Sequence, residues 1–194
     1  VVAIPGLYPL ARGADIPLSE RSRYQVFNDV CATIPNGAGY DLSRGTCGLQ
    51  VNIDTTPDNW IESVRAAIGI QPVITALFAN SSIYNRNVTN TVSQRAQLWF
   101  ANWSAPLKDF NQLVFREDFS PRTLVDYLVD RQPCYFFYRN GGFVSAEGRT
   151  FGDLLDHPES RPPGFVGAPT ISDFANVLGT VFSQVKIKPK GVLE

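Results

Sequence analysis

Apolar and polar residues alternate strictly over Thr46–Asp54, "TCGLQVNID". One side of this segment carries Cys47, Leu49, Val51 and Ile53, and the other carries Thr46, Gly48, Gln50, Asn52 and Asp54. A period of two is typical of a half-buried β-strand. We therefore predict a strand over residues 46–54 with its apolar side in the core. Its polar side is either solvated surface or the floor of a site.

Apolar residues at helical spacing predict several helices elsewhere. Thr56 before Pro57 and Ser120 before Pro121 each combine a capping residue with a proline in the first turn, which is typical of helix starts. Ser19 is a candidate cap of the same kind. The predicted helical ranges are 19–34, 56–69, 72–78, 91–103, 120–132, a short helix from Thr150, and 172–182.

Three further stretches predict strands. Residues 1–7 are apolar, residues 133–147 contain an Asn140-Gly141-Gly142 turn between two apolar runs, and residues 184–194 are interrupted by Pro189 and Gly191. Asn-Gly between such runs is a strong hairpin signal. Because hairpins and helices are mixed without strict alternation, we expect an α+β fold with an antiparallel sheet and packed helices, in a single domain over residues 1–194.

Composition narrows the possible functions. The chain has 194 residues, 44% of them hydrophobic and 18% charged, with a net charge of -1. Such a balance is typical of a soluble globular protein and argues against a nucleic-acid or membrane partner. No apolar run approaches the ~20 residues of a membrane span. The three cysteines, spaced widely in apolar sequence, predict free buried thiols in a reducing cytoplasm.

Candidate metal ligands are few. His157 is the only histidine, and it follows a predicted short helix, where an exposed capping role is the simplest interpretation. The chain contains no methionine and closes on "GVLE". These features lead us to expect a piece of a longer protein.

Several motifs, taken in order, resemble the plant- and bacterial-type glutamate–cysteine ligases and their carboxylate–amine ligase relatives. The ordered combination is more specific than any single motif. The matching segments are "DIPLSERSRY" (15–24), "TCGLQVNID" (46–54), "IQPVITALFANS" (70–81), "SQR" (93–95), "PCYFFYRNGGF" (133–143), "TFGDLL" (150–155) and "KPKGVLE" (188–194).

The resemblance implies a glutamine-synthetase-like antiparallel sheet, of which this chain would be the central part. It also implies an ATP-dependent ligase that forms a γ-glutamyl amide bond through γ-glutamyl phosphate. The small-molecule substrates would be glutamate and cysteine or another amino acid, ATP and Mg²⁺ would be the cofactors, and the cytoplasmic pathway would be glutathione biosynthesis.

The same resemblance assigns candidate site residues. Arg95, Tyr135 and Arg139 would bind the amino-acid substrate, since a guanidinium suits bidentate carboxylate recognition. Gln50, Asn52 and Glu194 would face the metal and nucleotide, because Mg²⁺ prefers oxygen ligands. Without the family resemblance, four of these residues have a simpler interpretation. Gln50 and Asn52 fit a solvated edge strand, Arg95 a surface helix, and Tyr135 core packing.

The chain also departs from the family pattern. The family's Glu-x-Glu and Glu-Pro-Gly-Gly segments, which hold Mg²⁺, are absent. We therefore expect little turnover by the chain alone and a complementary chain that carries these acidic metal ligands. The alternative is a non-catalytic amino-acid-binding or scaffold domain derived from the same fold.

Overall fold

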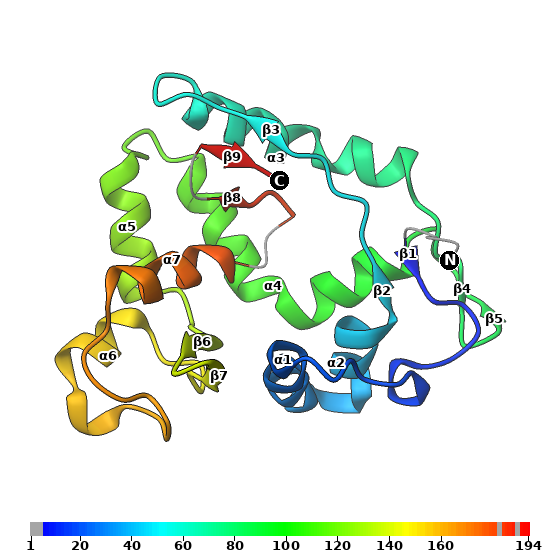
Figure 1. Cartoon of the computed structure of the whole chain (residues 1–194). Coiled ribbons are helices and arrows are strands. Elements are labelled where there is room, and N and C mark those ends of the chain that lie inside the picture. The colour runs from blue at the N-terminus through cyan, green and yellow to red at the C-terminus, as the bar shows by residue number, and fades with distance from the viewer. Residues whose placement is uncertain (1–5, 182–183, 189–190) are drawn as a thin grey trace. The chain divides into compact units, whose positions relative to one another are not determined.

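The computed structural model of the chain describes residues 6–181, 184–188 and 191–194 (Figure 1). The helices are α1 (Ser22–Ala32), α2 (Ala38–Tyr40), α3 (Trp60–Leu77), α4 (Gln94–Val114), α5 (Pro121–Asp130), α6 (Phe151–Asp156) and α7 (Ile171–Gly179). The strands are β1 (Gly6–Leu7), β2 (Thr46–Cys47), β3 (Ile53–Asp54), β4 (Ile83–Tyr84), β5 (Asn87–Val88), β6 (Phe136–Arg139), β7 (Gly142–Ser145), β8 (Ile187–Lys188) and β9 (Val192–Leu193).

Internal contacts divide the chain into two compact units. Unit 1 comprises residues 1–50 and 70–104, and unit 2 comprises residues 51–69 and 105–194. All pairs between the named strands are antiparallel. The α+β class expected from the sequence is therefore confirmed. The glutamine-synthetase-like arrangement and the single domain stay predictions.

Unit 1 is built around a tight junction between α1 and α2. Gly39 lies so close to the carbonyl of Cys31 that a Cβ atom would collide with it. Asp41, 3% exposed, ties this region to its neighbours. Its carboxylate accepts hydrogen bonds from the Gly13 amide (2.6 Å) and the Tyr84 hydroxyl (2.5 Å). A buried carboxylate is tolerated here because hydrogen bonds satisfy it.

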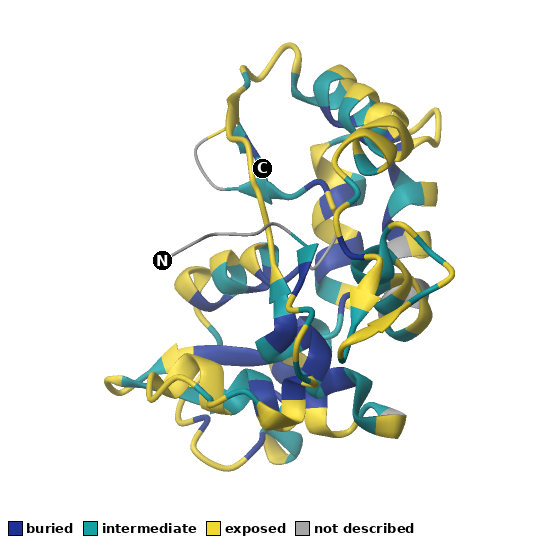
Figure 2. Cartoon of the chain, turned by 90° about the vertical axis from the view of Figure 1, so that its right-hand side faces the viewer, coloured by how far each residue is buried: buried dark blue, intermediate teal, exposed yellow. Residues whose placement is uncertain are grey.

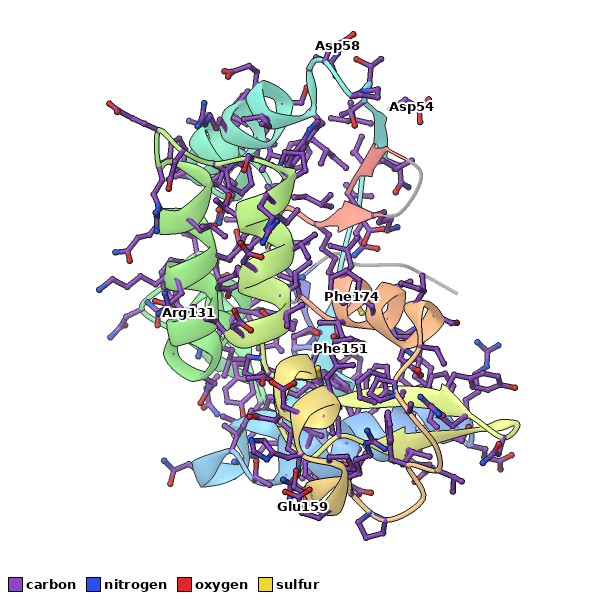
Figure 3. The ribbon with its side chains drawn as sticks, turned by 90° about the vertical axis from the view of Figure 1, so that its left-hand side faces the viewer. Asp54, Asp58, Arg131, Phe151, Glu159 and Phe174 are labelled. Atoms are coloured by element: carbon purple, nitrogen blue, oxygen red, sulfur yellow. The ribbon has the colours of Figure 1, made fainter. Side chains whose placement is uncertain are left out.

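Unit 2 holds the larger apolar core. α3 contributes Val64 and Ile68, and α4, α5, β6, α6 and α7 add the other large groups. Aromatic side chains pack edge to face within this core, as Phe151 and Phe174 do with ring centroids 5.3 Å apart (Figure 3). Figure 2 shows the buried residues in dark blue. From α3, Trp60, Ile61 and Ala67 also pack against this core, at helical spacing with Val64 and Ile68.

Two small antiparallel sheets complete unit 2. β6 and β7 form the predicted hairpin, with Arg139 opposite Gly142. Its turn residues Asn140 (φ 52°) and Gly141 (φ 80°) both have positive φ, which Asn-Gly adopts readily. The second sheet has the order β3-β9-β8. The predicted break near the end of the chain falls between β8 and β9, which pair with each other, and Pro189 lies outside the described residues.

Several predicted boundaries are wrong. α3 continues through Pro72, although proline removes one helical hydrogen bond, so no separate helix begins there. α1 begins at Ser22, and Ser19 instead offers its carbonyl to the Gln25 amide group. Between the predicted helices 72–78 and 91–103, residues 85–86 form the turn between β4 and β5, two strands that the sequence did not predict. Residues 1–5 and 182, which fall within predicted elements, lie outside the described part of the chain.

The strand predicted over residues 46–54 is also wrong in its middle. Only its two ends, β2 and β3, pair with other strands. The side expected to be buried is open, since Leu49, Val51 and Ile53 are 68%, 67% and 53% exposed. The alternation indicates extended backbone, but it cannot indicate which partner covers the apolar side.

We expect the substitution Ser120→Ala to lower the free energy of unfolding by about 1 kcal/mol, because Ser120 caps α5. Its hydroxyl accepts a hydrogen bond from the Thr123 amide, and the Thr123 hydroxyl accepts one from the Ser120 amide. Urea unfolding monitored by circular dichroism measures the change. Ser172→Ala, at an exposed position of α7, is the control and should change stability by less than about 0.5 kcal/mol. Equal effects would contradict the capping role.

Stability should fall as pH rises from about 9 to about 12. Burial raises the pKa of Cys31 to about 12, and burial raises that of Cys134 to about 12 with a smaller contribution from Asp153. In the unfolded chain these thiols ionise near 9.0, so above that pH the unfolded state binds fewer protons and is favoured. Below pH 9 their contribution is fully present.

Urea unfolding over pH 7–11 measures this decline. Replacing both Cys31 and Cys134 with alanine should flatten the curve. A native curve without any fall above pH 9 would contradict the burial of both thiols. Cys47, in contrast, is exposed, so the expectation of three buried thiols is wrong for this residue.

Candidate functional site

Arg95 occupies the start of α4, where the backbone is firmly held. Its amide donates to the hydroxyl of Ser81 at 3.1 Å, and Ser81 is 4% exposed. The Ser81 amide donates in turn to the Val92 carbonyl, and its own carbonyl accepts from Gln94. The "ALFANS" segment thus ends in a serine that fixes the position of Arg95. Sequence reasoning missed this role of Ser81.

The guanidinium of Arg95 lacks a counter-ion within the described ranges. Its Nε atom is buried and has no hydrogen-bond partner among the residues that the structure describes. Burial lowers the pKa of Arg95, and a weaker interaction with Cys47 opposes this change. Gly48 also borders the group, since a Cβ there would lie 3.6 Å from Nη2. A buried cation without a partner costs free energy, and a bound carboxylate would offset that cost.

Gln50 and Asn52, the predicted metal- and nucleotide-facing pair, are both exposed. Gln50 belongs to unit 1, as Arg95 does, whereas Asn52 belongs to unit 2. Each is therefore described within its own unit. That Gln50 and Asn52 face a metal and a nucleotide stays a prediction.

Asn52 and Glu194 do come together in unit 2, through a lysine. The Lys188 ammonium donates to Oδ1 of Asn52 at 3.3 Å and to the carboxylate of Glu194. Lys186 lies 4.0 Å from the same carboxylate, whose side chain is only 10% exposed. Both lysines lie in "KIKPKG" (186–191), a short run of basic residues near the end of the chain. Residues two apart in extended backbone point to the same face, so the spacing of Lys186 and Lys188 is the sequence signal that would have placed both near one carboxylate.

This cluster does not fit a Mg²⁺ site by itself. Magnesium requires near-octahedral oxygen coordination, but here one carboxylate is neutralised by two ammonium groups. Throughout the described part of the chain, no group of three or more His, Cys, Asp or Glu side chains could hold a metal ion. Any metal at this position would need ligands from elsewhere.

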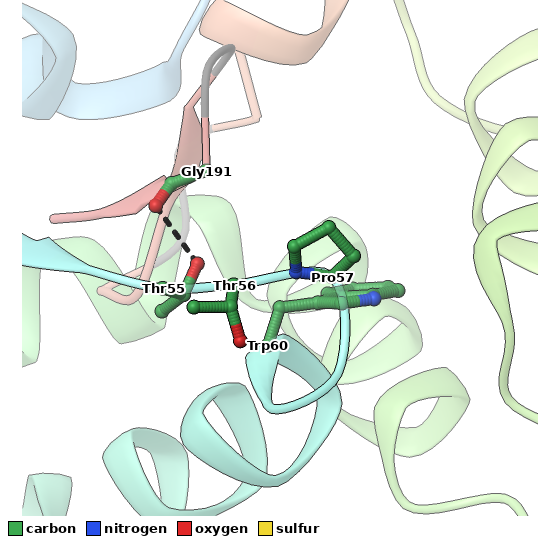
Figure 4. A pocket seen from close by; sticks show the side chains of 5 residues that line it. All are labelled: Thr55, Thr56, Pro57, Trp60 and Gly191. Carbon is green, nitrogen blue, oxygen red and sulfur yellow. Dashed lines mark hydrogen bonds between the residues drawn. The ribbon is translucent and has the colours of Figure 1, made fainter.

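A shallow pocket of about 260 Å³ lies beside this cluster in unit 2 (Figure 4). Thr55, Thr56, Pro57, Trp60 and Gly191 line it. The amide and hydroxyl of Thr55 both donate to the Gly191 carbonyl, at 2.7 and 2.8 Å, which fixes the β3 end against β9. The pocket has no charged lining group.

In unit 2, Tyr135 directly precedes β6, and Arg139 is the last residue of that strand. Tyr135 is 8% exposed. The Arg139 guanidinium is paired with Asp173 and also donates to the carbonyls of Val166 and Ala168. These contacts occupy four of the five N–H groups that an arginine offers. Sequence reasoning missed Asp173 as a partner, because 34 residues separate it from Arg139.

Comparison with known proteins identifies the class of enzymes that this chain is similar to. The chain is similar to glutamate–cysteine ligases named as chloroplastic, 33% identical to that of Brassica juncea and 32% to that of Medicago truncatula. It is 30% identical to glutamate–cysteine ligase B of Oryza sativa subsp. japonica. Each similarity covers 94% of this chain and 35–36% of the relative. The chain thus spans about a third of the length of these relatives.

The model of the glutamate–cysteine ligase family 2 (GCS2) matches residues 2–194. The chain belongs to this family. The resemblance carried by its motifs is therefore confirmed.

The comparisons and the structure each bear on where the protein is located. The expected cytoplasmic location is contradicted, because the relatives are named as chloroplastic enzymes. Within the described residues, no helix combines the length and apolar character needed to span a bilayer.

Proposed function

We propose that this chain supplies a substrate-binding part of an enzyme that joins the γ-carboxylate of glutamate to the amine of cysteine or another amino acid. The observation that carries this proposal is the half-buried Arg95, whose buried Nε lacks a hydrogen-bond partner among the described residues. Membership of the glutamate–cysteine ligase family supports the reaction class. ATP would be consumed, with γ-glutamyl phosphate as the intermediate.

Arg95 would bind a carboxylate of the amino-acid substrate. Ser81 holds the backbone of Arg95, so the guanidinium is positioned before the substrate arrives. A positioned fork can form two parallel hydrogen bonds to a carboxylate, which a lysine ammonium cannot. Tyr135 would shape the amino-acid pocket. Arg139, with a single N–H group left, would contribute less to binding.

Gln50, Asn52 and Glu194 would lie toward the nucleotide. Their oxygens suit a metal-bound triphosphate in type but not in number, because Glu194 is engaged by lysines. We therefore propose that acidic ligands from outside these 194 residues complete the ATP and Mg²⁺ site. This agrees with the small share of each relative that the chain spans.

The test is an assay of ATP-dependent γ-glutamylcysteine formation, detected by mass spectrometry. The chain is assayed alone and together with the polypeptide of the Brassica juncea ligase that lies outside the matched region, which we call the flanking segments. We expect product only in the mixture. Arg95→Lys, which keeps the charge but removes the fork, should lower the rate at least ~10-fold, a loss of about 1.4 kcal/mol. Arg21→Lys, at an exposed position, is the control.

Two results would oppose the proposal. Product formation that is insensitive to Arg95→Lys would remove Arg95 from the site. Glutamate binding without product in any mixture would favour a non-catalytic amino-acid-binding domain instead.

A further inference from the structure

The second half of α3 turns its apolar side outward. Five large side chains at helical spacing, the last of them directly after the end of α3, are 43–71% exposed: Ile70, Val73, Ile74, Leu77 and Phe78. We call these five residues the α3 stripe. Gln71 and Thr75, polar residues of the same turns, are less exposed than Val73 and Leu77. The usual order of an amphipathic helix is thus reversed in this half, all of which belongs to unit 1.

In the first half of α3, the apolar stripe is buried, as is usual for an amphipathic helix. There Val64 and Ile68 are 0% and 8% exposed and belong to the unit 2 core. The second half continues the apolar spacing without a cover. Residues 70–78 contain no charged side chain, and charge depletion is typical of the centre of a permanent interface.

The size of the stripe helps to identify its occupant. A fully open large side chain presents on the order of 150–200 Å². Five side chains that are about half exposed therefore offer roughly 400–500 Å². A stable, specific interface buries about 800 Å² on each partner, so this stripe alone is too small for a stable dimer of the chain. A partner held by additional contacts or by covalent continuity avoids this limit, because tethering raises the effective concentration.

We propose that the α3 stripe is the docking surface for the remainder of a family-length ligase, the polypeptide that the relatives carry outside the matched third. This proposal rests on the proposed function, since that polypeptide would also bring the acidic metal ligands. Its docking segment would present an uncharged apolar face to the α3 stripe. Docking at this surface would need no substrate.

Thiol labelling tests the proposal, and the native cysteines make the design simple. Cys31 and Cys134 are buried, so Cys47→Ser yields a background without an exposed native thiol. Leu77→Cys then places one thiol on the stripe, where Leu77 is 71% exposed. Val88→Cys, at an 82% exposed position on β5, is the matched control. Maleimide labelling rates are measured with and without the flanking Brassica juncea segments.

We expect the flanking segments to slow labelling of Leu77→Cys at least ~10-fold and to leave Val88→Cys unchanged. Equal rates with and without the segments, or a failure of the segments to associate, would overturn the proposal. Protection that grows with the concentration of the chain alone would identify a second copy as the occupant and would also overturn it. Loss of glutamate binding, in contrast, would affect only the proposed function.

Discussion

Replacing Arg139 with alanine should lower the free energy of unfolding by about 3–5 kcal/mol. The substitution leaves the carboxylate of Asp173, 3% exposed, without its cation. It also removes hydrogen bonds to the Val166 and Ala168 carbonyls and the contact of the guanidinium with the Phe165 ring, 4.2 Å from its centroid. Urea unfolding followed by circular dichroism measures the loss.

A matched control separates burial from charge. Arg122 and Asp126 also form an ion pair, but their side chains are 86% and 53% exposed. Arg122→Ala should therefore change stability by no more than about 0.5 kcal/mol. Combining Arg139→Met with Asp173→Asn should recover much of the loss, because no buried charge is left unpaired. If Arg139→Ala costs no more than Arg122→Ala, Arg139 does not hold unit 2 together.

Replacing Arg95 with glutamine should have opposite effects on binding and stability. We expect the dissociation constant for L-glutamate to rise at least ~10-fold, because the carboxylate loses its cationic partner. We also expect the free energy of unfolding to rise by an amount on the order of 1 kcal/mol, since an unpaired, partly buried charge is removed. Isothermal titration calorimetry and urea unfolding measure the two quantities on the same sample.

This pair of changes distinguishes a binding residue from a structural one. If Arg95 were structural, its substitution would lower the free energy of unfolding of the protein, as we expect for Arg139. Arg21→Gln, at an exposed position, should alter neither quantity. Loss of stability in Arg95→Gln together with unchanged glutamate binding would assign Arg95 a structural role.

Local signals in the sequence were sufficient to predict the helix starts at Ser120 and Thr150 and the hairpin. Ser120 before Pro121 and Thr150 specify helix starts through hydrogen bonds within three residues. Asn140-Gly141 specifies a turn through its own backbone preference. His157 ends α6 with an exposed side chain, as its position predicted. Each of these features depends on contacts that are close in sequence.

Features set by distant contacts could not be predicted in the same way. The pairing of Arg139 with Asp173 joins β6 to α7. The exposed apolar side of residues 49–53 depends on a cover that the pattern does not specify. Arg95 was predicted from the family motif, but its buried, unpartnered Nε follows from the packing around α4. The family motif assigns Glu194 to the metal, but its two lysine partners follow from the fold at the end of the chain.

The central claim is that Arg95 binds a substrate carboxylate. The most direct measurement is the ¹⁵N NMR signal of the Arg95 Nε–H group, assigned by its absence in Arg95→Lys, during a titration with L-glutamate. The account predicts a saturable shift of this signal as the unpartnered group gains an acceptor, while the Nε–H signal of Arg139 stays in place. A signal of Arg95 that does not move while glutamate binds, or the absence of any glutamate binding, would contradict the claim.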